Sequence, residues 1–164
     1  MKEISARRIV QTPIGRISIA ASESGITNLD FLSSRSRLTD FATSPIAQSL
    51  ADEAARQLEE YFAGKRTGFD LKFDLAGTKF QQMVWQQIQK IPFGSTISYG
   101  EIAKAIRKPK AARAVGGAVG ANPVAILIAC HRVMGAAGTL TGYSGGAGLP
   151  TKKKLLELEG ISYR

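Results

Sequence analysis

Apolar and polar residues alternate along the first part of the chain, and this period of two predicts a β-sheet. The alternation runs over residues 16–21, directly after a turn signal at 12–15, and a second apolar segment covers 26–32. Residues 69–73 alternate in the same way and predict a further strand. The polar stretch 33–43 is expected to be a loop.

A helical spacing of apolar residues follows this loop. Ser44 and Pro45 fit an N-cap and the first helical position, where proline loses no hydrogen bond. The apolar residues three and four apart behind them are Ile46, Leu50, Ala54, Leu58, Tyr61 and Phe62. One helix beside several strands predicts a small α+β lobe over residues 1–75.

The second part of the chain, residues 76–164, has mostly the helical period. A helix is expected after Thr78, because apolar residues recur at helical spacing behind it. Ser98 and Glu101 form a Ser-x-x-Glu capping box, which is typical of a helix start. This part is therefore predicted to be a helical lobe.

Three further segments complete this lobe. The apolar run 124–129 is predicted to be a strand that leads to the only cysteine. The stretch 135–148 is rich in glycine and is expected to be a loop that can wall a pocket. A last helix over 152–159 should end at Gly160, a suitable C′ residue.

Composition narrows the class of protein. The 164 residues suffice for one full core or for two small lobes. A single cysteine excludes an internal disulfide and a multi-cysteine zinc site. A free thiol fits a reducing compartment, and no stretch resembles a signal peptide or a membrane span. We therefore expect a soluble cytoplasmic protein.

The net charge of +9 comes from 22 Lys and Arg against 13 Asp and Glu. Such an excess points to an anionic partner, of which nucleic acid is the commonest, although solubility alone would also explain it. Binding to a membrane surface is disfavoured, because no basic amphipathic helix with a broad apolar face is found.

Two short helices joined by a tight turn, over 99–106 and 111–120, fit a helix-turn-helix. Residues 114–120 of the second helix carry almost no bulky side chain. Small residues let a backbone approach another surface closely, which is either a DNA groove or a neighbouring helix. Cations near the turn favour DNA, because they can contact phosphates. They are Lys104, Arg107, Lys108, Lys110 and Arg113.

The only cysteine, Cys130, is followed directly by the only histidine, His131, and then by Arg132. A thiol is a nucleophile only as thiolate, which a neighbouring base or cation favours. A lone cysteine is also often a small buried hydrophobe, so the pair alone decides nothing. Beside a basic helix-turn-helix, however, it suggests covalent chemistry on a DNA base that has left the stack.

Eight runs of residues occur in an order and spacing that identify a family. They are Thr12-Pro13-Ile14-Gly15, Phe80-Gln81-Gln82-Met83-Val84-Trp85, Ile91-Pro92-Phe93-Gly94, Ser98-Tyr99-Gly100-Glu101-Ile102-Ala103, Lys110-Ala111-Ala112-Arg113-Ala114-Val115-Gly116, Asn122-Pro123-Val124, Cys130-His131-Arg132-Val133 and Thr141-Gly142-Tyr143-Ser144-Gly145-Gly146. On these runs the chain resembles the O6-alkylguanine-DNA alkyltransferases, which repair DNA by direct reversal. The resemblance covers nearly the whole chain. It implies an N-terminal ribonuclease H-like sheet lobe and a C-terminal helical lobe with a helix-turn-helix.

The resemblance also implies a role for each of five catalytic positions. Cys130 would accept the alkyl group, His131 would act as base through a water, and Glu159 would orient that histidine. Asn122 would brace the turn, while Tyr99 would press on a phosphate and donate to the leaving guanine. The alkyl group of O6-alkylguanine, or less readily of O4-alkylthymine, would pass irreversibly to the sulfur, once per molecule.

The same resemblance implies the residues that touch DNA and the flipped base. Arg113 would enter the duplex where the guanine was, in the minor groove. The other DNA-binding residues would be Tyr99, Lys110, Ala114, Gly116 and Gly117. The base pocket would be lined by Val133, Tyr143, Ser144 and Gly145. The expected partner is double-stranded DNA with alkylated bases, bound by a monomer without metal or cofactor.

Two positions depart from the family pattern. Ala129 stands where proline usually precedes the cysteine, so the approach to the thiol loses some stiffness. Val119 stands where a larger residue is common. No reacting atom is lost at either position.

Three other functions fit the sequence less well than alkyl transfer does. A lesion-binding protein without transfer is the main alternative, but relatives of that kind replace the cysteine. A sequence-specific regulator would offer several polar side chains to base edges, and this helix offers mainly Arg113. A cysteine hydrolase would not need the basic charge.

Overall fold

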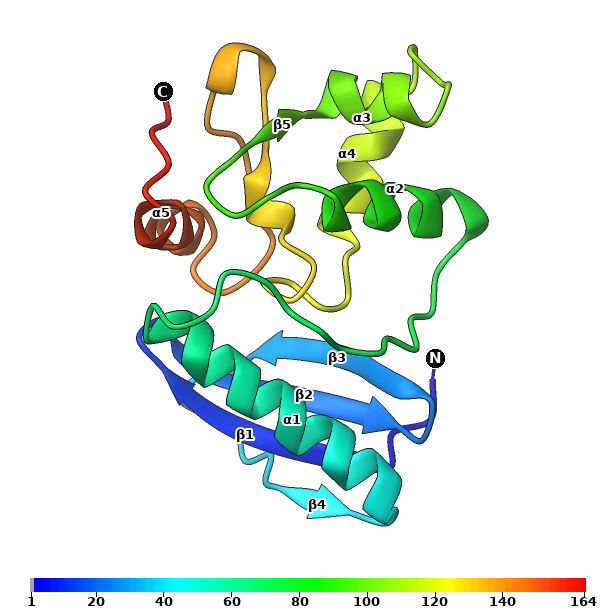
Figure 1. Ribbon diagram of the computed structural model, residues 1–164, viewed down its shortest axis with the longest axis vertical. Coiled ribbons are helices and arrows are strands. Elements are labelled where there is room, and N and C mark those ends of the chain that lie inside the picture. The colour runs from blue at the N-terminus through cyan, green and yellow to red at the C-terminus, as the bar shows by residue number, and fades with distance from the viewer. Residues whose placement is uncertain (1) are drawn as a thin grey trace. The chain divides into compact units, whose positions relative to one another are not determined.

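The computed structural model describes residues 2–164, which divide into two compact units, one that ends at Ala76 and one that spans Gly77–Arg164 (Figure 1). The first unit holds an antiparallel sheet and a helix, and the second is mostly helical. The α+β fold class predicted from the sequence is confirmed. None of the helices between residues 2 and 164 is both long and apolar enough to cross a membrane.

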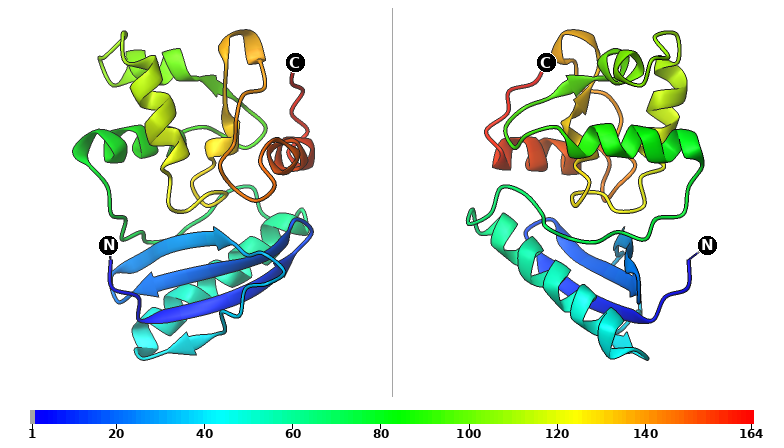
Figure 2. Two further views of the ribbon diagram at one scale, coloured as in Figure 1. Left: turned by 180° about the vertical axis from the view of Figure 1, so that it is seen from behind. Right: turned by 45° about the vertical axis from the view of Figure 1, so that its right-hand side comes forward.

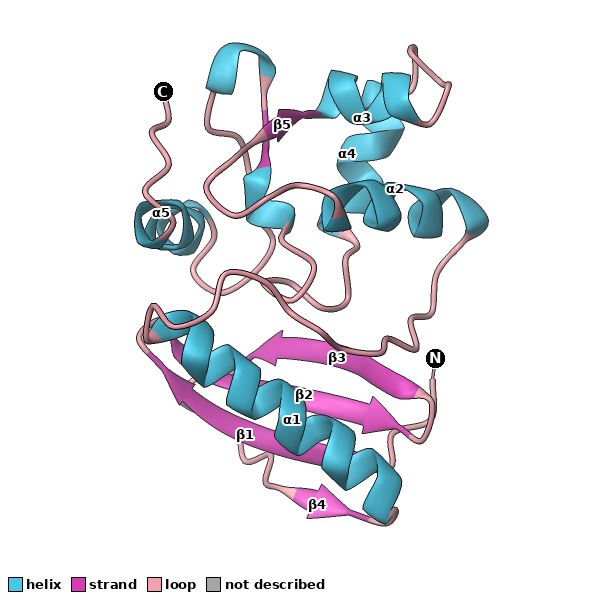
Figure 3. Cartoon of the chain, viewed as in Figure 1, coloured by secondary structure: helices cyan, strands magenta, loops and turns pink. Residues whose placement is uncertain are grey.

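The sheet of the first unit is built from four antiparallel strands in the order β3-β2-β1-β4 (Figure 3). They are β1 Ala6–Thr12, β2 Gly15–Ser22, β3 Gly25–Phe31 and the short edge strand β4 Phe41–Ala42. The predicted turn joins β1 to β2, and Gly15 adopts φ +109° there, a conformation that side chains rarely allow. The stretch predicted to be wholly loop thus contributes β4 at its end.

Helix α1 (Pro45–Phe62) covers one face of this sheet (Figure 2). The Ser44 hydroxyl accepts a hydrogen bond from the Ala47 amide at 3.3 Å, and Pro45 occupies the first turn, as predicted. The helix turns small residues towards the strands, so the backbones pack closely. Its buried side chains are Ala47, Ala51, Ala54, Ala55, Gln57, Leu58 and Tyr61.

The strand predicted over 69–73 is wrong. Only one isolated bridge forms there, in which Phe73 pairs with Ile26 of β3 in parallel. The Gln57 side chain explains the difference, because it donates to the Asp70 carbonyl at 3.0 Å and accepts from the Asp70 amide at 2.9 Å. A side chain from α1 thus satisfies the backbone groups that a strand ladder would have used.

The second unit contains four α-helices, two short 3₁₀ turns and one pair of short strands (Figure 3). The helices are α2 Lys79–Gln89, α3 Tyr99–Ala105, α4 Ala112–Gly120 and α5 Leu149–Leu158. The strands β5 Ile97–Ser98 and β6 Val133–Met134 pair in parallel. The capping box of Ser98 and Glu101 is confirmed, and Thr78 with Gln81 forms another at the start of α2.

Helix α4 packs against α2 and α3, with Trp85 of α2 at the centre. The Trp85 indole donates to the Ala118 carbonyl of α4 at 2.8 Å, so its polar atom is satisfied inside the core. A Cβ added at Gly77 would lie 2.5 Å from the Trp85 ring. Glycine is therefore required where the chain enters this unit.

Candidate active site and DNA-binding face

The segment that leads to Cys130 is a buried turn, so the strand predicted over 124–129 is wrong. Asn122 shapes this turn: its side-chain amide donates to the Ile128 carbonyl at 2.8 Å, and its side-chain oxygen accepts from the Val124 amide at 3.0 Å. Ile126 adopts φ +74°, which is strained for a β-branched residue. The turn then enters a 3₁₀ turn, Cys130–Arg132.

Cys130 lies at a cavity of about 350 Å³ within the second unit. The lining residues come from α3, α4, the thiol segment and the glycine-rich loop. They are Tyr99, Gly116, Val119, Gly120, Cys130, Gly142, Tyr143 and Ser144. A flat group of the size of a base could therefore reach the sulfur from the side of α4.

The Cys130 thiol is buried, and burial raises its pKa. Three groups oppose that rise: the Asn122 amide by a hydrogen bond, the Lys152 ammonium group by its charge, and Tyr143 by a hydrogen bond. The resting thiol is thus protonated at neutral pH, and a base must remove its proton before it can attack.

His131 is fully buried and hydrogen-bonds to Glu159, with 2.6 Å between Nε2 and Oε2. The Nδ1 atom of the same ring is buried and has no hydrogen-bond partner among residues 2–164. Burial lowers the pKa of His131, and Glu159 partly offsets this. The ring is therefore neutral at physiological pH, with one acceptor nitrogen left over.

Arg132 does not face the sulfur, although it stands two residues from it. Its Nε atom donates to Glu159 Oε1 at 2.7 Å and Nη2 donates to Oε2 at 3.1 Å. Sequence adjacency had suggested a cation beside the thiol, and the structure puts this one on the carboxylate behind the histidine.

Lys152 is a buried charge close to the site that sequence reasoning missed. It is 1% exposed, its Nζ atom donates to the Val133 carbonyl at 2.8 Å, and its charge acts on Cys130. Lys152 shares a helix face with Leu155, Leu156 and Glu159, three, four and seven residues on. That spacing was the signal that could have separated it from its exposed neighbours.

The two helices α3 and α4 form the predicted helix-turn-helix. On α4, the residues Val115, Ala118 and Val119 are buried, while Arg113, Ala114, Gly117 and Gly120 are exposed. The predicted cations Lys104, Arg107, Lys108, Lys110 and Arg113 are exposed as well. No acidic side chain of residues 2–164 forms an ion pair with any of these five.

The small residues of α4 lie on two faces with different surroundings, one packed and one open. The buried face packs against α2 and α3. On the open face, a Cβ added at Gly117 would meet nothing within 4 Å. Gly116 lies beside the Tyr99 ring, 3.9 Å from where its own Cβ would be.

The residues predicted to line the base pocket are placed differently from one another. Tyr143 and Ser144 line the cavity, and the Ser144 hydroxyl donates to the Gly120 carbonyl at 3.0 Å. Val133 is fully buried in β6, and Gly145 is not among the lining residues. Tyr99 is hydrogen-bonded to Thr141, with 2.9 Å between the two hydroxyl oxygens.

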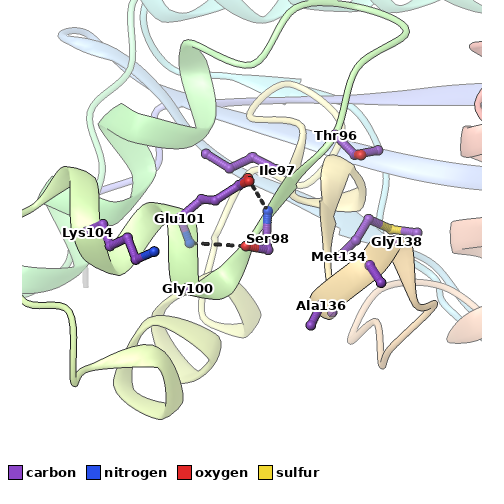
Figure 4. A pocket seen from close by; sticks show the side chains of 11 residues that line it. Thr96, Ile97, Ser98, Gly100, Glu101, Lys104, Met134, Ala136 and Gly138 are labelled. Atoms are coloured by element: carbon purple, nitrogen blue, oxygen red, sulfur yellow. Dashed lines mark hydrogen bonds between the residues drawn. The ribbon is translucent and has the colours of Figure 1, made fainter.

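A second cavity of about 410 Å³ lies between α3 and the loop after β6 (Figure 4). Its wall shows the capping box, in which the Ser98 amide donates to Glu101 at 2.9 Å and the Glu101 amide donates to Ser98 at 3.1 Å. This pair of hydrogen bonds fixes the start of α3 and hence the position of Tyr99.

Across residues 2–164, no three His, Cys, Asp or Glu side chains gather as metal ligands.

Comparison with known proteins places this geometry in a family. The profile of the 6-O-methylguanine DNA methyltransferase DNA-binding domain matches residues 79–161, and that of the ribonuclease-like domain of the same proteins matches residues 6–75. The methylated-DNA–protein-cysteine methyltransferase of Methanosarcina barkeri is 49% identical, over 92% of this chain and 94% of its own. The Mycobacterium tuberculosis protein of that name is 49% identical, over 93% and 90%.

A solved structure agrees with these matches. The crystal structure of Mycobacterium tuberculosis OGT in complex with DNA superimposes with a TM-score of 0.80 at 48% identity, covering 93% of this chain and 91% of that one. Both units have a counterpart in the matched profiles, and the similarity spans nearly the whole chain. The chain therefore belongs to the 6-O-methylguanine DNA methyltransferase family, as its resemblance implied.

Proposed function

We propose that this protein repairs DNA by moving the alkyl group of O6-alkylguanine, and less readily of O4-alkylthymine, to the sulfur of Cys130. One observation carries the proposal: the only cysteine borders a cavity beside the smooth face of a helix-turn-helix, next to a buried His131–Glu159 pair. The relatives named above are methyltransferases of this kind, which supports the assignment.

The open face of α4 is suited to the minor groove of duplex DNA. Its small residues Ala114, Gly116 and Gly117 allow the helix backbone to approach the duplex, while Lys110 and its neighbours contact phosphates. Arg113 is exposed at the start of α4 and fills the space of the flipped guanine. Tyr99, between α4 and the cavity, presses on the neighbouring phosphate.

The transfer step moves one alkyl group and one proton. The thiol proton passes to Nδ1 of His131 through a water, and Glu159 stabilises the resulting imidazolium. The thiolate then forms the S–C bond as the C–O6 bond breaks, and the electron pair of that bond goes to guanine. Guanine takes up a proton from the Tyr99 hydroxyl, Tyr99 regains a proton from the His131 imidazolium through solvent, and Asn122 holds the sulfur in position.

The product is a thioether, which water does not readily hydrolyse, so each molecule acts once. No second cysteine is present to take the group away. The flipped base is contacted in the pocket by Tyr143, Ser144, Gly145 and the Val133 backbone. We also assign the protein to the cytoplasm, where a free thiol stays reduced, and to a monomeric state.

The decisive measurement is the intact mass of the protein after incubation with duplex DNA that carries one O6-methylguanine. We expect a gain of about 14 Da that stops at one per molecule, because the thioether is the end of the reaction. Cys130→Ala should bind the same duplex and gain nothing.

Two results would contradict the proposal. Tight binding of the lesion without a gain in mass would make the chain a damage-recognition protein. A gain that persists in Cys130→Ala would place the acceptor elsewhere.

A further inference from the structure

The Glu159 carboxylate contacts three partners at once, which are His131, Arg132 and the Gly94 amide. One oxygen, Oε2, lies 2.6 Å from His131 Nε2 and 3.1 Å from Arg132 Nη2. The other, Oε1, accepts from Arg132 Nε at 2.7 Å and from the Gly94 amide at 3.2 Å. The carboxylate is fully buried, so these contacts determine its charge state.

A buried carboxylate alone would draw a proton onto its histidine, because an opposite charge stabilises imidazolium. Such a ring could no longer accept the thiol proton. Arg132 meets the same carboxylate through two parallel N–H donors, the strongest arrangement for this pair of groups. It keeps Glu159 ionised and compensates its charge.

We propose that Arg132 is a positioning residue for alkyl transfer, which together with burial keeps His131 neutral, with its proton on Nε2. An ionised Glu159 can only accept, so Nε2 must donate. Nδ1, which has no partner in residues 2–164, is then the acceptor nitrogen. The inference rests on the proposed function, because it specifies how the base of that reaction is prepared.

The charges around the ring agree with this assignment. Lys152 of α5 and Glu159, the C-cap residue of that helix, face His131, while Arg132 and the thiol of Cys130 belong to its own 3₁₀ turn. Burial lowers the pKa of His131, Glu159 raises it, and Arg132 and Lys152 lower it again. The two cations thus offset part of the rise in pKa that the carboxylate causes.

Arg132 is held in place by the turn after α2, independently of the histidine. Its Nη1 atom donates to the Ile91 carbonyl at 2.8 Å, and its guanidinium lies 5.8 Å from the centre of the Phe93 ring. The Gly94 amide of the same turn also donates to Glu159, so this turn holds both members of the Arg132–Glu159 ion pair.

The test uses the fact that His131 is the only histidine in the chain. Nitrogen NMR of protein labelled at histidine reports one ring, its tautomer and its titration, with no DNA present. We expect wild-type protein to show Nε2 protonated and Nδ1 bare down to low pH. Arg132→Gln should form imidazolium at a pH at least about one unit higher, because the compensating charge is gone.

Two further variants separate charge from packing. Arg132→Lys keeps a positive charge but loses the paired donors, so its titration should lie between wild type and Arg132→Gln. It also carries the test if Arg132→Gln does not fold. Phe93→Leu removes the ring beside the guanidinium and leaves the ion pair, so we expect a lower melting temperature with a wild-type titration.

A wild-type titration in Arg132→Gln, or in Arg132→Lys where only that variant folds, would overturn the proposal. So would an equal shift in Phe93→Leu, since packing would then explain it. The acid limb of the single-turnover transfer rate should move with the NMR titration in the same variants. Because the NMR readout needs no alkyl transfer, failure of the proposed function would leave the role of Arg132 separately decided.

Discussion

Single residues around the thiol of Cys130 influence its charge state and the backbone conformation that leads to it. Ala129 replaces the proline that is usual in the family, yet it adopts φ −76°, close to the angle a proline ring would impose. The backbone conformation that proline would impose before Cys130 is therefore retained. Because alanine does not restrain φ, the rigidity of this segment depends on the residues packed around it. The charge state of the thiol depends most on burial, which raises the pKa of Cys130, while the Asn122 hydrogen bond and the Lys152 charge oppose that rise.

Replacing Lys152 should slow the reaction through the thiol. In Lys152→Met we expect the pKa of Cys130 to rise further, because a buried positive charge is lost. Alkyl transfer at neutral pH should slow about tenfold, which corresponds to one pKa unit. Rapid-quench kinetics with labelled duplex measure this rate.

Lys153→Met is the matched control, because Lys153 is exposed on the next position of the same helix. Its transfer rate should equal that of wild type. An unchanged rate in Lys152→Met would mean that the ammonium group serves only its hydrogen bond to Val133.

At the scale of elements, α4 combines a packed face and an open face within nine residues. Val115, Ala118 and Val119 hold the helix on α2 and α3, so glycines on the opposite side do not leave it unsupported. Each glycine still costs about 1 kcal/mol of helix stability relative to alanine. The exposed glycines thus lower helix stability on the face where a flat surface is suited to contact DNA.

Gly117→Leu should separate stability from binding. A Cβ atom at this position meets nothing within 4 Å, and leucine improves helix propensity, so the free energy of unfolding should rise by up to about 1 kcal/mol. The same side chain blocks the groove, and the dissociation constant for duplex DNA should increase at least about tenfold. Urea unfolding and fluorescence anisotropy measure the two quantities.

The dependence of this affinity on salt should stay the same, because every phosphate-contacting cation is retained. Gly117→Ala, with a single methyl group, should lie between wild type and Gly117→Leu. Unchanged affinity in Gly117→Leu would show that this face of α4 does not enter a groove.

At the scale of the whole molecule, burial of ionisable groups links folding to pH. The pKa of His131 lies below its ordinary value of 6.5 in the folded protein. Below about pH 6.5 the histidine of the unfolded chain is protonated, while that of the folded chain stays neutral. The free energy of unfolding therefore falls as the pH falls.

We expect the free energy of unfolding to drop by up to about 1.4 kcal/mol per pH unit below this point. His131→Gln has no group that titrates there and should lose this slope, even if its stability is lower throughout. Urea unfolding between pH 7.5 and 5.5 provides the comparison. A wild-type stability that does not change over this range would contradict the assignment of a neutral, buried His131.

Sequence patterns were sufficient where a local rule acts alone. The caps at Ser44 and Ser98, the helix periods and the turn at Gly15 depend on residues a few positions apart, and all were predicted. The order of motifs also identified the family and the reactive Cys130. Nothing local, however, indicated that the run before Cys130 would turn rather than extend.

Tertiary structure decided what depends on groups far apart in the chain. Gln57 removes the strand at 69–73, Asn122 bends the approach to the thiol, and Arg132 reaches Glu159 instead of its neighbour Cys130. Lys152 becomes a functional charge only because α5 buries it. The sequence alone predicted the helices and their caps and singled out one cysteine as the candidate acceptor, since these follow from periodicity, capping and residue type. The fold determined the charge states, because burial and distant partners control which group holds a proton.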